Sequence, residues 1–140
     1  MSYDLSRFHK AQQRDYADAL AEIRAGRKRT HWIWYIFPQI QGLGFSSTSQ
    51  YYAIRNLDEA KAYLADPVLR ARLLEISQAL LELPSSDPSA VMGYPDDMKL
   101  KSSMTLFELA DPDCPVFPAV LEKFFGGERD RRSIRLAREL

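Results

Sequence analysis

The sequence has little of several features that define whole classes of proteins. A single cysteine, Cys114, stands among the 140 residues, which excludes an internal disulfide framework. No stretch approaches the roughly twenty consecutive apolar residues that a membrane-spanning helix needs. The first residues, Met1-Ser2-Tyr3-Asp4, lack the basic segment followed by an apolar one that marks a secretory signal. We therefore expect a cytoplasmic protein that does not enter a membrane.

The chain also lacks an excess of either charge. Nineteen basic and nineteen acidic residues cancel, so no field over the whole surface favours nucleic acid or an anionic membrane. Two distant histidines and one cysteine do not have the spacing of a zinc site, and we expect no metal. Neither the dinucleotide fingerprint nor the P-loop pattern is complete, so the sequence predicts no cofactor.

No segment alternates apolar and polar residues between turn signals, as half-buried strands do. Apolar residues instead recur every three or four positions, which is typical of amphipathic helices. The pattern predicts an all-α fold of about six to eight helices, forming a single compact domain over residues 1–140. The helices are expected at residues 5–24, 57–65, 67–83, 95–110, 116–125 and 130–140. Residues 31–37 are apolar at nearly every position, so a short helix is favoured there and a strand is the alternative.

Local signals place several helix boundaries. Asn56 followed by Glu59 resembles a capping box, and Asp66-Pro67 ends one helix while capping the next. Gly126-Gly127 should end the helix that precedes it. The helix over residues 67–83 carries the most regular apolar stripe, so we expect it to be the central packing element; its members are Leu69, Leu73, Ile76, Leu80 and Leu83.

The most distinctive segment runs from His31 to Tyr52. It begins with His31, contains both tryptophans, Trp32 and Trp34, and leads into a glycine-bearing loop. Aromatic walls with a few polar groups suit a small-molecule pocket, with His31 and Gln39 supplying polar contacts at its edge. Large aromatic rings also form hydrophobic cores. The sequence leaves both interpretations open.

The loop from Gly42 to Ser49 is a second candidate. Gly42 and Gly44 allow close approach of the backbone, so the amides and hydroxyls around Ser46 suit an anionic group. The alternative is a turn that only carries the chain out of the aromatic segment.

A third candidate lies on the helix that begins near Pro95. Lys99, Ser102 and Ser103 are spaced i, i+3 and i+4, so they share one face of that helix. An ammonium and two hydroxyls would suit a phosphate or a carboxylate if this face turned toward the glycine loop. The alternative is a solvated face.

Four longer motifs run through the chain: Asp4-Leu5-x-Arg7-Phe8; Gly26-Arg27-Lys28-x-x-His31-Trp32-x-Trp34-x-x-Phe37-Pro38-Gln39-x-x-Gly42-Leu43-Gly44; Tyr52-Ala53-Ile54; and Lys99-Leu100-x-Ser102-Ser103-Met104-Thr105-Leu106-Phe107. On these motifs the chain resembles the DUF1810 proteins, a family with no established activity whose related structural group is called Rv1873-like. The resemblance covers nearly the whole chain and implies a mainly α-helical single domain, with no catalytic residue or cofactor to carry over. Some members bear the label calpastatin, a calpain inhibitor that acts through disordered repeats, which this compact composition does not match.

Together these residues predict a pocket for a small anionic, nucleotide-like ligand. Trp32 and Trp34 would be its walls, with polar contacts from Gln39, Gly42, Gly44, Ser46, Ser102 and Ser103. If the protein is an enzyme, which the sequence leaves open, His31 would transfer a proton and Lys99 would stabilise negative charge.

Two other functions stay open. A protein-interaction module would use exposed aromatic and arginine side chains as a hot spot. Nucleic-acid binding would use the basic clusters within residues 24–29 and 129–138. Glu128, Asp130 and Glu139 dilute the second cluster, which disfavours nucleic acid.

Overall fold

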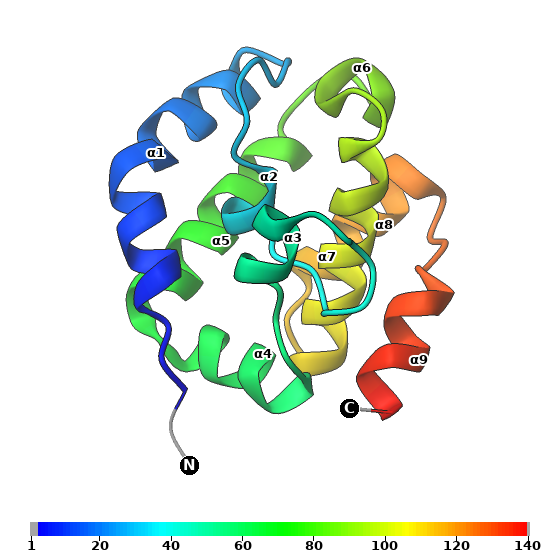
Figure 1. Cartoon of the computed structure of the whole chain (residues 1–140). Helices are drawn as coiled ribbons and strands as arrows, with labels where there is room; N and C mark the ends of the chain where they lie inside the picture. The colour runs from blue at the N-terminus through cyan, green and yellow to red at the C-terminus, as the bar shows by residue number, and fades with distance from the viewer. Residues whose placement is uncertain (1–2, 140) are drawn as a thin grey trace.

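The computed structural model describes residues 3–139, which contain nine helices and no strand, so the all-α prediction is confirmed. Met1 and Ser2 at the N-terminus and Leu140 at the C-terminus lie outside the described residues. No helix in residues 3–139 combines the length and hydropathy that crossing a bilayer requires. The helices are α1 (Ser6–Arg24), α2 (Ile33–Ile36), α3 (Ser47–Tyr52), α4 (Leu57–Ala65), α5 (Pro67–Leu81), α6 (Pro88–Met92), α7 (Asp96–Ala110), α8 (Val116–Phe125) and α9 (Arg131–Glu139) (Figure 1). The number exceeds six to eight because no helix was expected at α3 or α6.

Three predicted capping residues, Asn56, Asp66 and Gly126, begin or end helices as expected, whereas α1 begins after Leu5 with no side-chain cap. The side chain of Asn56 accepts a hydrogen bond from Glu59 N at 2.8 Å, which caps α4. The carboxylate of Asp66 accepts bonds from the first backbone amides of α5. Gly126 adopts a left-handed φ of 61° and ends α8. In a capping box the Glu59 carboxylate would accept from the backbone amide of Asn56. Here it accepts from Arg55 N instead.

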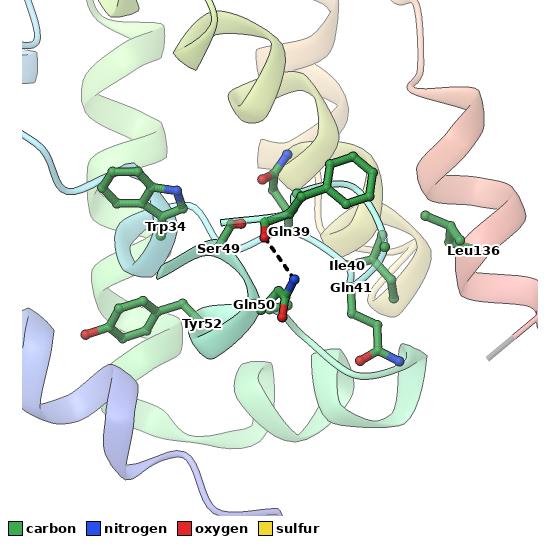
Figure 2. A pocket seen from close by; sticks show the side chains of 12 residues that line it. Trp34, Gln39, Ile40, Gln41, Ser49, Gln50, Tyr52 and Leu136 are labelled. Carbon is green, nitrogen blue, oxygen red and sulfur yellow. Dashed lines mark hydrogen bonds between the residues drawn. The ribbon is translucent and has the colours of Figure 1, made fainter. Parts of the chain in front are cut away.

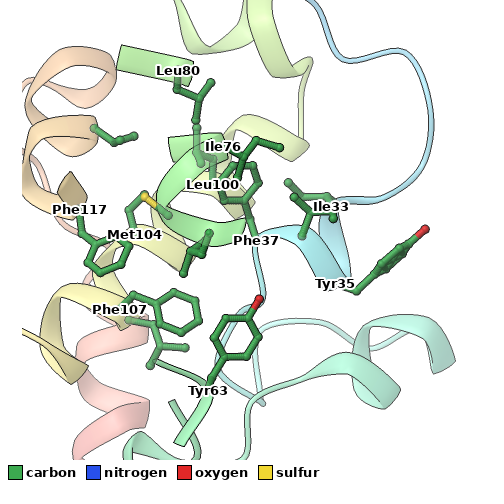
Figure 3. Packing of buried hydrophobic residues seen from close by; sticks show 14 of the residues in the cluster. Ile33, Tyr35, Phe37, Tyr63, Ile76, Leu80, Leu100, Met104, Phe107 and Phe117 are labelled. Carbon is green, nitrogen blue, oxygen red and sulfur yellow. The ribbon is translucent and has the colours of Figure 1, made fainter. Parts of the chain in front are cut away.

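The central packing element is α7, so the expectation that the helix over residues 67–83 would be central is wrong. Every residue from Leu100 to Phe107 is buried, and α7 packs against α2, α4, α6, α8 and α9. The main neighbours of α5 are α1, α4 and α8. Figure 3 shows Leu100, Met104 and Phe107 of α7 among buried side chains from other helices. The buried apolar residues form one cluster.

The loop of residues 41–53, whose two ends are joined by backbone hydrogen bonds, contains α3, which lies beside α2 (Figure 1). Gln41 N donates to Ile54 O at 2.8 Å, and Ile54 N donates to Gln39 O at 2.8 Å. Ile40 and Ile54, which form an isolated parallel bridge, are both buried. These bonds hold residues 41–53 as an arch, which forms one wall of the site described next.

Candidate functional site

A surface groove with two adjoining hollows lies between the arch, α7 and α9. One hollow, of about 510 Å³, is called here the carboxamide chamber, and the other, of about 620 Å³, the lysine chamber. The two share part of their walls, so they lie side by side. The shared residues are Trp34, Gln39, Gly44, Phe45 and Ser49. The carboxamide chamber adds Ile40, Gln41, Gly42, Gln50, Tyr52, Ala53 and Leu136, and the lysine chamber adds Leu43, Ser46, Tyr94, Pro95, Met98, Lys99, Ser102, Asp130 and Arg132.

The carboxamide chamber has no charged side chain in its wall. Three glutamines, Gln39, Gln41 and Gln50, line it together with aromatic and aliphatic side chains (Figure 2). Gln50 donates through Nε2 to Phe45 O at 2.9 Å, which fixes that amide against the arch. The side chains of Gln39 and Gln41 make no hydrogen bond to other residues within 3–139. Their amide donors and acceptors therefore remain available to a bound molecule.

The lysine chamber has three charged side chains in its wall, those of Lys99, Asp130 and Arg132. The Lys99 ammonium lies 5.2 Å from the centroid of the Trp34 ring and 3.3 Å from Asp96 Oδ1. The other oxygen of Asp96 is 2.8 Å from the ammonium of Lys28, whose side chain is only 6% exposed. Because the closer and more buried lysine takes the larger share of the Asp96 charge, Lys99 keeps an incompletely balanced positive charge at the wall of the groove.

The N-terminal part of α9 completes this chamber. Arg132 donates through Nη2 to Gly42 O at 3.3 Å, and a Cβ on Gly42 would meet the side chain of Leu136 at 3.2 Å. Gly42 has a φ of +100°, so its backbone and its lack of a side chain both fit this close approach. The contact brings the cation of Arg132 beside the glycine loop, ninety residues earlier in the chain.

Asp130 adds a negative charge to the same wall. Its carboxylate accepts hydrogen bonds from the hydroxyls of Ser102, at 2.8 Å, and of Ser133. Asp130 N also donates to Thr105 Oγ1 at 3.0 Å. These bonds join the start of α9 to α7, so the Ser102 hydroxyl, expected to contact a ligand, is engaged with the protein itself.

Most of the predicted ligand-contacting residues do come together. Trp34, Gln39, Gly44, Ser46, Lys99 and Ser102 line the lysine chamber, and Gly42 lines the carboxamide chamber. The hydroxyl of Ser46 caps α3 by accepting from Ser49 N at 3.1 Å. The aromatic segment and the α7 face thus meet at one groove, although ligand binding by these residues stays a prediction.

Trp32 and Ser103 do not line the groove, and for both the expected position is wrong. The ring of Trp32 is 1% exposed, and its Nε1 donates to Glu22 Oε1 at 3.0 Å. Ser103 is fully buried, and its hydroxyl has no hydrogen-bond partner within the described chain. The aromatic segment is therefore core at Trp32 and groove wall at Trp34.

Glu22 fixes the basic segment that leads to Trp32. Its carboxylate accepts hydrogen bonds from Arg29 N, from the amide and hydroxyl of Thr30, and from Trp32 Nε1. Partial burial alone would raise the pKa of Glu22, but these bonds outweigh it and hold the pKa at about 2. The segment that carries Lys28 toward Asp96 is therefore anchored by a carboxylate that stays ionised.

His31 lies apart from Lys99. Its exposed side chain lines a third, shallow hollow of about 560 Å³, which shares Trp34 with both chambers and Tyr52 with the carboxamide chamber. Burial first, and a hydrogen bond to Asp15 second, raise the pKa of the neighbouring Tyr35 to about 12. Since Lys99 does not line that hollow, the structure does not bring the two predicted catalytic residues to one site.

Sequence reasoning missed several residues of the groove. The rim carries Phe45, Tyr94 and Met98, which are 83%, 81% and 48% exposed and are three of the five exposed large hydrophobic residues of the described chain. Gln41 and Arg132 were also missed as site residues. A weak signal existed for Phe45, because a large aromatic residue between Gly44 and Ser46 is unusual in a simple turn.

One residue of each basic cluster is paired with a carboxylate of the protein. Lys28 is paired with Asp96, and Arg129 forms two hydrogen bonds to the carboxylate of Glu108, at 2.8 and 2.6 Å.

In residues 3–139, no three or more histidine, cysteine, aspartate or glutamate side chains are grouped so that they could hold a metal ion.

Comparisons with known proteins agree with the fold. The profile of the family described as "Protein of unknown function (DUF1810)" matches residues 2–137. The structure is similar to the crystal structure of the conserved hypothetical protein Rv1873 from Mycobacterium tuberculosis, with a TM-score of 0.93 and 44% sequence identity over 96% of each chain. No curated protein matches the chain.

Proposed function

This chain belongs to the DUF1810 family of proteins of unknown function, and from its site we propose that the groove binds a small anionic ligand whose negative charge lies in the lysine chamber. The observation that carries the proposal is the position of Lys99. Its ammonium faces the Trp34 ring at 5.2 Å and has a single protein acceptor, Asp96, within the described residues. An ammonium has three donors, so two remain for a ligand.

The charges around the chamber support this choice of ligand. Lys28, Lys99 and Arg132 face Asp96 and Asp130, which leaves an excess of one positive charge. A charge-assisted hydrogen bond in a partly desolvated groove contributes about 1.5–3 kcal/mol. A phosphate or carboxylate would gain such bonds from Lys99 and Arg132, whereas a cation would meet repulsion.

A proton-transfer step is not part of the proposal. His31 lines a third hollow rather than either chamber, and no histidine in residues 3–139 lines the groove. Lys99 therefore serves here as a binding residue.

A second candidate function is protein interaction, which the exposed rim favours. Phe45, Tyr94 and Met98 expose apolar surface of the kind that anchors an interface. Variants of Lys99 and of the rim distinguish the two functions, because binding of a small anion requires Lys99 and does not require the rim residues. Nucleic-acid binding has less support, since the basic clusters are partly engaged inside the protein.

Calorimetric titration tests the proposal. The probes are inorganic phosphate, citrate, ribose 5-phosphate and AMP, each added to the wild-type chain and to Lys99→Met. At least one probe should bind, and Lys99→Met should weaken it about tenfold or more. Lys61→Met, an exposed lysine on α4 outside the groove, is the matched control and should bind as the wild type does.

Two results would contradict the proposal: no probe binds at millimolar concentration, or Lys99→Met and Lys61→Met have equal effects. Binding of a protein partner that is lost in Phe45→Ser and kept in Lys99→Met would support the interaction module instead.

A further inference from the structure

Resting on the proposed function, we infer that the ligand has two parts and is a nucleoside monophosphate. The phosphate would lie in the lysine chamber and the flat base in the carboxamide chamber. The inference comes from the contrast between the two chambers, which differ in charge although they share one wall.

The carboxamide chamber matches an uncharged heterocycle. Its wall has no charged side chain and presents the three amides of Gln39, Gln41 and Gln50. A carboxamide offers a donor and an acceptor side by side, which is the pattern on the edge of a nucleobase. The side-chain amides of Gln39 and Gln41 have no hydrogen bond to other residues in 3–139.

Aromatic side chains supply the apolar faces that a flat ring needs. Trp34, Phe45 and Tyr52 all line the carboxamide chamber, and Phe45 is 83% exposed. Stacking of a base on such a side chain contributes binding energy whatever the base is. An aliphatic anion would use the lysine chamber and leave these rings in water.

The two chambers adjoin at Gly44 and Ser49, which line both hollows. A Cβ on Gly44 would lie 2.5 Å from Ser49 Oγ, so the Ser49 side chain packs directly against Gly44 at this boundary. The volumes, about 510 and 620 Å³, fall within the range of small-molecule sites.

Comparison of AMP, GMP, CMP and UMP with ribose 5-phosphate by calorimetry tests the inference. At least one nucleotide should bind about tenfold more tightly than ribose 5-phosphate, because the sugar phosphate lacks the base. Gln41→Met keeps the length of the side chain and removes its amide. It should lower the ratio of the two affinities about fivefold, whereas Gln13→Met, an exposed glutamine on α1, should keep that ratio.

The outcomes separate this inference from the proposed function. If ribose 5-phosphate binds through Lys99 and no nucleotide binds more tightly, the two-part ligand is wrong and the anion site stands. If no phosphate compound binds, both are wrong. If Gln41→Met does not fold, which its melting curve shows, the wild-type comparison still decides, and Gln50→Met replaces the variant.

Discussion

Replacing Glu22 by glutamine should change how the stability of the protein depends on pH. Glu22→Gln keeps the shape of the side chain and its acceptor oxygen but removes the charge that four hydrogen bonds assist. The pKa of this carboxyl is about 2 in the folded protein, against an ordinary value of 4.5. At about 1.4 kcal/mol per pH unit, the stabilisation has an upper limit of about 3.5 kcal/mol. Glu22 is partly exposed, so solvent screening lowers this to about 1–2 kcal/mol.

The sign of the effect follows from the lowered pKa. The stabilisation by Glu22 is complete above pH 4.5 and is lost as the pH falls toward about 2. Urea unfolding at pH 7 should therefore show Glu22→Gln less stable than the wild type by about 1–2 kcal/mol. Repeating the measurement down to pH 2 should bring the two free energies of unfolding together. A constant difference across that range, or none at pH 7, would refute the reasoning.

Three further variants test other parts of the structure. The ammonium of Lys123 donates to the carbonyls of Leu80, Leu81 and Leu83 at the end of α5, so Lys123→Met should lower stability by about 2 kcal/mol in urea unfolding; a loss no larger than that of Lys61→Met would contradict this. Ser103→Ala removes a buried hydroxyl that has no partner within the described residues, so its melting temperature should equal or exceed that of the wild type, and a clear fall would reveal an unseen partner. His31→Ala should bind the tightest phosphate probe within about twofold of the wild type, since His31 lines a third hollow rather than either chamber; a tenfold loss in calorimetry would place His31 in the site.

The sequence predicted those parts of the fold that depend on neighbouring residues. Asn56, Asp66 and Gly126 act within a few positions, so their chemistry is readable along the chain. The helix α3 was missed because six residues are too few to show a period, although Ser46 caps it. The central position of α7 was not predicted, because Lys99, Ser102 and Ser103 give one face of this helix a polar sequence. Ser103 on that face is nevertheless fully buried.

The site was predictable as a region and not in its details. Trp32 and Trp34 stand in one apolar segment, and a helix of four residues gives no pattern that tells which ring faces the core. The difference arises because Glu22 holds Trp32 inside. The pairing of Lys28 with Asp96 and the contact of Arg132 with Gly42 join distant segments, so no local motif reveals them. The single domain over residues 1–140 stays a prediction that one cooperative unfolding transition would support.

The central claim is that a small anion binds beside Trp34, and the two indole N–H signals in a nitrogen–proton NMR spectrum test it most directly. Trp34→Phe assigns them, since one signal disappears. Titration with ribose 5-phosphate should move the Trp34 signal to saturation and leave the buried Trp32 signal in place. Equal movement of both signals, or no movement of either at millimolar concentration, would contradict the account.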